Sequence, residues 1–221
     1  MKNMNCIYNS TCQIDCTNNC LRYIQFNRLL ELSNLPKYFR KPIKIYSTEQ
    51  DRNSYIKLSE IKSNIKEFIN NGNNLYICSS ICGNGKTTWA TKIMLKYFDV
   101  TWKNSYDYTR GLYVHVPTLL LDLKNFDNRP EYIDRIKDAD LVIWDDIAFS
   151  NKLTEYEHEQ LLMLIDNRIN EGKSNIYTSN QTTIEDLTKF IGGRLASRIF
   201  NGSEIITFYS KDYRKNISGG N

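Results

Sequence analysis

Two kinds of hydrophobic pattern alternate along residues 54–221. Short, almost uninterrupted apolar runs predict buried strands, at Leu75–Cys78, Gly111–Val116, Leu141–Trp144, Asn175–Thr178 and Glu204–Phe208. Between them, apolar residues recur at helical spacing and predict helices, at Ser59–Asn70, Lys86–Phe98, Thr118–Phe126, Glu155–Asn170, Ile184–Phe190 and Arg194–Phe200. Because this alternation is typical of a parallel sheet covered on both faces, we predict an α/β fold with a five-stranded parallel sheet sandwiched by helices.

The first 53 residues follow a different pattern. Residues 1–20 are polar and rich in Asn and Cys, whereas 21–33 have apolar positions at helical spacing. Pro36 ends that helix, because the residue before a proline avoids helical backbone. Residues 36–53 are basic and irregular, which is typical of a linker. We therefore expect a small Cys-rich helical N-terminal segment with a linker over 1–53 and a main domain over 54–221.

Composition and charge narrow the class of protein. Hydrophobic residues make up 41% of the 221 positions, enough for a folded core. No run approaches the ~20 apolar residues that span a bilayer, and no apolar stretch follows the N-terminus, so we expect a cytoplasmic protein without a membrane partner. Residues 1–60 hold nine basic and five acidic side chains, which accounts for the whole net charge of +4. This excess fits an acidic or nucleic-acid partner, or a solvated surface.

Residues 80–88 carry the pattern of a phosphate-binding loop, Ser-Ile-Cys-Gly-Asn-Gly-Lys-Thr-Thr. It matches G-x-x-x-x-G-K-[ST] between a strand and a helix, with Ser80 in place of the first glycine. Glycines let backbone N–H groups approach phosphate, and the helix N-terminus attracts the anion. We predict that Lys86 contacts the β- and γ-phosphates of ATP, that Thr87 binds Mg²⁺, and that Ser80 keeps a negative φ. The alternative is an ordinary glycine turn before a helix. The predicted ATP-binding residues of the loop are Ser80, Gly83, Asn84, Gly85, Lys86, Thr87 and Thr88.

Asp145 and Asp146 follow a fully apolar strand. In P-loop ATPases the first such carboxylate holds Mg²⁺, and the next one can orient or deprotonate the attacking water. We assign the metal role to Asp145 and the base role to Asp146, rather than a solvated acidic turn. Because Asp is one methylene shorter than Glu, we expect weak ATPase activity. Asn180 follows a later strand and is expected to contact the water or the γ-phosphate, or to begin a turn.

Two arginines near the end of the chain, Arg194 and Arg198, are four residues apart and share one helix face. An arginine that reaches the γ-phosphate of a neighbouring subunit stabilises the transition state, and Arg198 is the first candidate and Arg194 the second, with self-association as the consequence. Surface salt bridges are the alternative. Arg214 is a candidate nucleotide sensor within its own subunit, or an ordinary tail residue.

Four cysteines, Cys6, Cys12, Cys16 and Cys20, are separated by five, three and three residues. Four thiolates suit tetrahedral Zn²⁺, and an iron–sulfur cluster also uses four. The third possibility is that the four thiols are reduced and bind no metal. Because so polar a segment hardly folds without a staple, we favour a metal.

Taken together, NLYICSS…GNGKT, LYVHVPTLLL, LVIWDDI, KSNIYTSN and GGRLASRI resemble the AAA+ ATPases of the DnaC/DnaI replicative helicase-loader type, in particular short phage-encoded ones. CLRYIQFNRLLELSNLP resembles their N-terminal region. The resemblance implies a P-loop fold without a C-terminal lid. It also implies ATP-dependent loading of a replicative hexameric DNA helicase, bound by the N-terminal region, onto single-stranded DNA during DNA replication. By motif match it implies nucleotide-site roles for Lys86, Thr87, Asp145, Asp146 and Asn180, a finger role for Arg198 and a sensor role for Arg214. Ser80 and the cysteine spacing depart from the family pattern.

A DNA site is expected where positive charge and an aromatic ring occur together, at Lys124, Phe126, Arg129 and Arg135. Two other functions share the ATP-binding motifs. One is a transposition-type AAA+ regulator acting on duplex DNA, and the other is a small-molecule P-loop kinase, for which the sequence offers no substrate lid.

Overall fold

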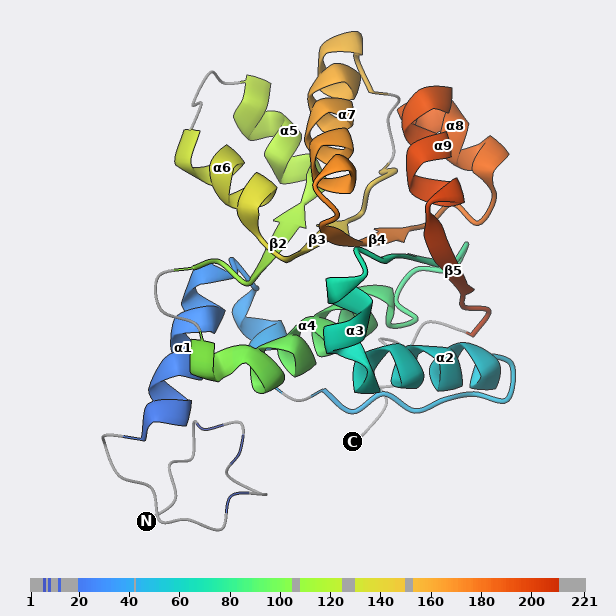
Figure 1. The fold of residues 1–221 in the computed structure, drawn as a ribbon. Coiled ribbons are helices and arrows are strands. Elements are labelled where there is room, and N and C mark those ends of the chain that lie inside the picture. The colour runs from blue at the N-terminus through green and yellow to red at the C-terminus, as the bar shows by residue number, and fades with distance from the viewer. Residues whose placement is uncertain are drawn as a thin grey trace, which may run out of the picture.

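A five-stranded parallel sheet forms the centre of the protein (Figure 1). The computed structural model describes residues 20–41, 43–104, 108–124, 130–149 and 153–210, together with Cys6, Tyr8 and Cys12. The strands lie in the order β2-β3-β4-β1-β5, and every neighbouring pair is parallel. The predicted α/β fold with a five-stranded parallel sheet is thus confirmed. The strands are β1 (Asn74–Cys78), β2 (Gly111–His115), β3 (Leu141–Asp145), β4 (Ser174–Ser179) and β5 (Ser203–Thr207).

Helices cover both faces of this sheet, and each layer encloses its own hydrophobic cluster (Figure 1). One layer contains α1 (Leu21–Leu32), α2 (Arg52–Ser63), α3 (Ile65–Asn70) and α4 (Lys86–Thr101), with the short 3₁₀ helices η1 (Lys37–Arg40) and η2 (Trp102–Asn104). The other contains α5 (Val116–Lys124), α6 (Pro130–Asp138), α7 (Glu155–Asn170), α8 (Ile184–Ile191) and α9 (Gly193–Asn201).

Local sequence explains where these elements begin and end. Every residue of β3 and β4 is buried, as expected for central strands with a helical layer on each face. Thr154 and Glu157 form a reciprocal capping box at the start of α7. Gly72 ends α3 with a φ of 64°, and a Cβ there would lie 2.7 Å from the carbonyl oxygen of Gly172, so only glycine fits this turn.

Three regions differ from the sequence-based expectation. The helix predicted over Ser59–Asn70 is two helices, because the backbone leaves helical geometry at Asn64 (φ −102°, ψ 27°). Helix α6 was not predicted, and the predicted linker contains η1 and the start of α2. Helix α1 buries Phe26, Leu29 and Leu30 in the same hydrophobic cluster as α4. The division near Asn53 stays a prediction.

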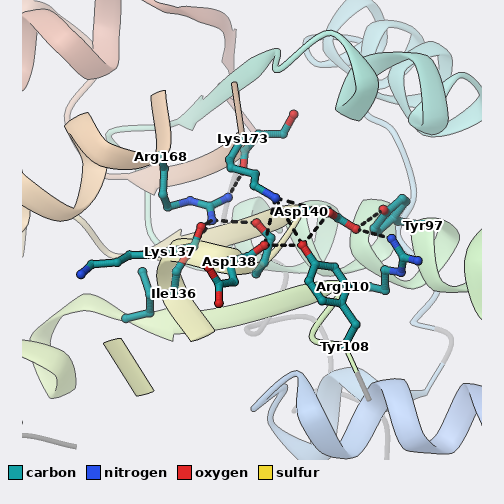
Figure 2. Close-up of polar contacts among 11 residues, drawn as sticks. Tyr97, Tyr108, Arg110, Ile136, Lys137, Asp138, Asp140, Arg168 and Lys173 are labelled. Atoms are coloured by element: carbon teal, nitrogen blue, oxygen red, sulfur yellow. Dashed lines mark hydrogen bonds and ion pairs between the residues drawn. The ribbon is translucent and has the colours of Figure 1, made fainter. Parts of the chain in front are cut away.

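The amino ends of β3 and β4 are fastened by a buried arginine (Figure 2). Arg168 at the end of α7 donates from Nη1 to the carbonyl oxygens of Ile136 (2.6 Å) and Ala139 (2.7 Å), at the end of α6. Its Nη2 donates to the carbonyl oxygen of Ser174 (2.6 Å) at the start of β4. Because these backbone acceptors satisfy the guanidinium, this edge of the sheet is a structural network. Among the helices in the described ranges, none combines the length and apolar character needed to cross a membrane.

Candidate nucleotide-binding site

A cavity of about 810 Å³ opens at the carboxyl edge of the sheet. Its floor is the loop between β1 and α4, including Gly83, Gly85 and Lys86, and its wall contains Asp146 and Asn180, which follow β3 and β4. The structure therefore brings together loop and strand-end residues predicted from three separate motifs. Cavities of roughly 300–1,000 Å³ hold small ligands and cofactors, so this one is large enough for a nucleotide.

The phosphate loop curves around the Lys86 side chain. Gly83 and Gly85 have φ values of 77° and 97°, which glycine adopts without strain. Lys86 is only 7% exposed, and its Nζ donates to the carbonyl oxygen of Ile81 at 3.1 Å. Burial lowers the pKa of Lys86. Asn34 and Asp146 are the two described non-glycine residues with positive φ, so Ser80 keeps the negative φ that was expected of it.

A buried serine just before the loop anchors it to the sheet. Ser79 Oγ accepts hydrogen bonds from the backbone N–H group of Ile81 (3.1 Å) and from the side-chain amide of Asn84, and the backbone N–H of Ser79 donates to the carbonyl oxygen of Ser179 (3.2 Å) at the end of β4. Asn84 is fully buried. These bonds hold the loop against the ends of β1 and β4, and its backbone N–H groups are therefore preorganised for an anion.

Asp145 is the most heavily hydrogen-bonded carboxylate of the site. Thr87 Oγ1 and Thr178 Oγ1 both donate to Oδ1 at 2.7 Å, and the phenol of Tyr113 donates to Oδ2 at 2.6 Å. Asp145 is 5% exposed. Burial, followed by the charge of Asp145, raises the pKa of Tyr113, so its hydroxyl stays protonated and donates. Thr178 and Tyr113 were not predicted; hydroxyls near the carboxyl ends of apolar strands were the available signal.

Thr87 and Asp145 fit a magnesium ion. Their oxygens lie 2.7 Å apart, near the separation of about 2.9 Å between adjacent ligands of an octahedral Mg²⁺.

Asp146 leaves the strand in a left-handed conformation, with a φ of 55°. Its backbone N–H donates to Thr178 Oγ1 at 3.1 Å, and its side chain, 45% exposed, lines the cavity. His115 is 42% exposed at the end of β2, with Nε2 4.0 Å from Asp146 Oδ2.

A further wall of the cavity comes from the segment that the sequence indicated as a linker. Tyr38, Phe39, Ile43, Ile45 and Tyr46 line it opposite the phosphate loop. These apolar and aromatic side chains, spaced among lysines, give the cavity a surface suited to a flat base. Their lack of helical or strand periodicity concealed this role.

Arg194 and Arg198 lie on the exposed side of α9, near Asp166 of α7. Arg198 Nε is 3.1 Å from Asp166 Oδ1, and Arg194 Nη2 is 3.9 Å from Oδ2. Both arginines line a hollow with Asn74, the first residue of β1. They therefore lie at the amino edge of the sheet, opposite the nucleotide cavity.

Several predicted site residues are only partly described or fall outside the described ranges. Arg214, Phe126, Arg129 and the side chain of Lys124 are outside them. Arg135 is inside and donates a hydrogen bond to the carbonyl oxygen of Leu32, which joins α6 to the end of α1.

The cysteine prediction is likewise untested. In the part of the chain that the structure describes, no group of three or more His, Cys, Asp or Glu side chains is placed to hold a metal ion. Cys16 lies outside the described residues, so the four-cysteine site stays a prediction.

The DnaC helicase loader and the replication initiator DnaA are among the solved structures with a similar fold. The DnaC helicase loader is similar with a TM-score of 0.63 and 17% identity, over 75% of this chain and 94% of that one. DnaI is similar with a TM-score of 0.64 and 20% identity, over 84% of this chain and 98% of that one. The replication initiator DnaA bound to AMPPCP and single-stranded DNA has a TM-score of 0.58 and 20% identity, over 79% of this chain and 51% of that one.

No protein-family model matches the sequence, and no curated protein sequence gives a significant match. The structural likeness shows that this chain shares the α/β fold of these proteins.

Proposed function

We propose that this protein is an ATP-dependent loader that places the replicative hexameric DNA helicase on single-stranded DNA during DNA replication. The observation that carries the proposal is the likeness to the DnaC helicase loader and to DnaI, which extends over 94% and 98% of those chains. The likeness to DnaA bound to AMPPCP and single-stranded DNA supports a nucleotide and a single strand as ligands.

In this proposal the cavity at the carboxyl edge binds ATP. The loop amides and Lys86 hold the phosphates, while the aromatic wall around Tyr38 and Tyr46 holds the base. Thr87 and Asp145 hold Mg²⁺, which neutralises charge on the phosphate oxygens when bound. Asp146 and Asn180, both in the cavity wall, position the attacking water, and the short reach of Asp146 keeps hydrolysis weak.

Self-association completes the site. Arg198 lies at the amino edge of the sheet, away from the cavity of its own chain. It can contact a γ-phosphate only when a second copy presents its cavity to that edge. Release from Asp166 costs little, because the ion pair is largely exposed at Arg198 (53%).

The remaining assignments follow the resemblance of the sequence to helicase loaders. Residues 1–53 bind the helicase, with Zn²⁺ held by the cysteines, and Arg214 senses the nucleotide. Single-stranded DNA binds near Lys124, Phe126 and Arg129. The protein acts in the cytoplasm of a bacterium or of a phage-infected host cell.

A loading assay on circular single-stranded DNA tests the proposal, because a ring helicase must be opened to encircle a strand without ends. Purified protein, the ring helicase of the host and ATP are combined, and DNA-bound helicase is counted. We expect the loader to raise that amount at least about tenfold, and Lys86→Ala to abolish the gain. Lys92→Ala, on the same helix but outside the cavity lining, is the control. A protein that binds no ring helicase and prefers duplex DNA would be a transposition-type regulator instead.

A further inference from the structure

Three hydroxyl groups from three different elements converge on one carboxylate. Thr87 at the start of α4 and Thr178 of β4 donate to Oδ1 of Asp145, and Tyr113 of β2 donates to Oδ2. Thr87 and Thr178 both contact the oxygen nearest the phosphate loop. Tyr113 alone, among the described donors to this group, contacts the other oxygen.

Tyr113 reaches Asp145 diagonally across the sheet. In the parallel register Tyr113 lies opposite Ile143, and His115 lies opposite Asp145. Its phenol must therefore extend two residues towards the carboxyl edge to meet the carboxylate. The ring is held in place, because it is 8% exposed and belongs to the hydrophobic cluster that contains Ile143. The hydroxyl is consequently a fixed donor at one side of Asp145.

A fixed donor on Oδ2 decides how the carboxylate is turned. The terminal torsion of Asp is soft and nearly two-fold, so the group can otherwise rotate and exchange its oxygens. With Oδ2 bonded to Tyr113 at 2.6 Å, Oδ1 stays 2.7 Å from Thr87. Magnesium requires near-ideal octahedral geometry and is therefore sensitive to this orientation.

We propose that Tyr113 is a positioning residue that orients Asp145 for Mg²⁺ and thereby sets how strongly the bound nucleotide depends on the metal. The inference rests on the proposed nucleotide site and adds to it a residue from β2, a strand to which the sequence assigns no part of the ATP site. If Tyr113 had a purely structural role, loss of its hydroxyl would change the Mg²⁺ dependence of nucleotide binding no more than loss of the hydroxyl of any other buried tyrosine bonded to a carboxylate.

The chain contains such a tyrosine. Tyr97 of α4 is 5% exposed, and its hydroxyl donates to Asp140 Oδ2 at 2.7 Å (Figure 2). Asp140 directly precedes β3 and so lies at the amino edge, away from the nucleotide cavity. Tyr97→Phe is therefore a control matched to Tyr113→Phe in burial, in the kind of hydrogen bond and in the atoms removed.

The test is a Mg²⁺ titration of nucleotide binding, followed with a fluorescent ATP analogue, for the wild type and both variants. For Tyr113→Phe we expect the half-saturating Mg²⁺ concentration to rise about tenfold, with binding in EDTA unchanged. For Tyr97→Phe we expect a wild-type Mg²⁺ titration, even where its melting temperature falls as much as that of Tyr113→Phe.

Two results would overturn the inference: a Tyr113→Phe titration that coincides with the wild type, or an equal shift in Tyr97→Phe. Both leave the nucleotide site standing, because the wild type still binds the analogue in a Mg²⁺-dependent way. A wild-type protein that binds no analogue would overturn the proposed function along with the inference.

Discussion

Thr87 Oγ1 lies 2.7 Å from Asp145 Oδ1, although 58 positions separate the two residues in the sequence. Thr87 lies in the first turn of the helix after the phosphate loop, and Asp145 is the last residue of a buried strand. Parallel strands place their carboxyl ends at the same edge of the sheet, where ligands of open α/β folds bind. This contact is therefore the point at which the two nucleotide motifs meet.

Replacing Asp146 by Asn is expected to separate hydrolysis from binding. Asn keeps the side-chain shape and tolerates the φ of 55°, and the bond from the backbone N–H to Thr178 is retained. Because the amide cannot accept a proton, we expect the ATPase rate to fall about 100-fold or more, with ATP affinity within about twofold of wild type. Single-turnover hydrolysis and equilibrium binding measure the two quantities. Unchanged hydrolysis would exclude Asp146 as the base.

Arg198 is expected to act on the nucleotide of a second copy. The Arg198→Ala variant keeps an intact cavity but lacks the arginine, and the Asp146→Asn variant keeps the arginine but lacks the base. Each variant alone is therefore expected to be inactive. A mixture of the two contains interfaces in which Arg198 of one variant faces the intact site of the other. We expect the mixture to recover about a quarter of the wild-type ATPase rate, the fraction of interfaces that are complete under random assembly. An inactive mixture, or an Arg198→Ala protein with the wild-type rate, would contradict a role between subunits.

The aromatic wall is expected to bind the base and not the phosphates. Tyr38 and Tyr46 are 67% and 72% exposed, so their replacement by Ala should leave the fold intact. Loss of stacking should weaken ATP binding about tenfold, while the affinity for inorganic triphosphate stays the same. Tyr209→Ala, 63% exposed and outside the cavity lining, is the control. Equal losses for ATP and triphosphate would place the base elsewhere.

The contact between Tyr8, near the N-terminus, and α4 is expected to weaken at acid pH. Asp99 accepts hydrogen bonds from Tyr8 (2.8 Å) and Arg22 (2.6 Å). Burial alone would raise the pKa of Asp99, but hydrogen bonds from Lys96, Tyr8 and Arg22 outweigh it and lower that pKa. Because the pKa of Asp99 is lower in the folded state than the unfolded value of about 3.9, the ionised carboxylate stabilises the fold at pH values above about 3.9. This contribution is lost as the pH falls through the folded-state pKa.

Thermal unfolding of the wild type and Asp99→Asn checks this dependence. We expect the variant to melt about 2–4 °C lower between about pH 5 and 7, and the difference to shrink below about pH 4 and to vanish once the pH is below the lowered pKa of Asp99. A difference that stays constant into the acid range would show that the carboxylate charge does not stabilise this contact.

Much of the fold was predictable because the strands are buried on both faces. Residues 141–145 are all buried, and Leu141–Trp144 is accordingly an uninterrupted apolar run. Helix α6 was not predicted, because its apolar residues are few among charged neighbours: Tyr132, Ile133 and Ile136. The break at Asn64 has no proline or glycine to mark it.

The candidate site likewise has parts that the sequence predicts and parts that it does not. That Lys86, Thr87 and the acidic pair come together at one edge of the sheet was predictable, because the P-loop pattern and an acidic pair after an apolar strand both occur at the carboxyl ends of parallel strands. The aromatic wall of the cavity was not predictable, because an apolar lining requires no fixed spacing of residues. Tyr113 and Thr178 act through hydrogen bonds across neighbouring strands, and strand register is a property of the folded sheet.

Isothermal titration of Mg²⁺-ATP into the wild type, Lys86→Ala and Lys92→Ala is the most direct measurement. Lys86 is buried inside the loop, whereas Lys92, further along the same helix, does not line the cavity. The account predicts one ATP bound per chain in the wild type and in Lys92→Ala, with Lys86→Ala at least about tenfold weaker. Equal affinity in all three proteins would contradict an ATP site in this loop.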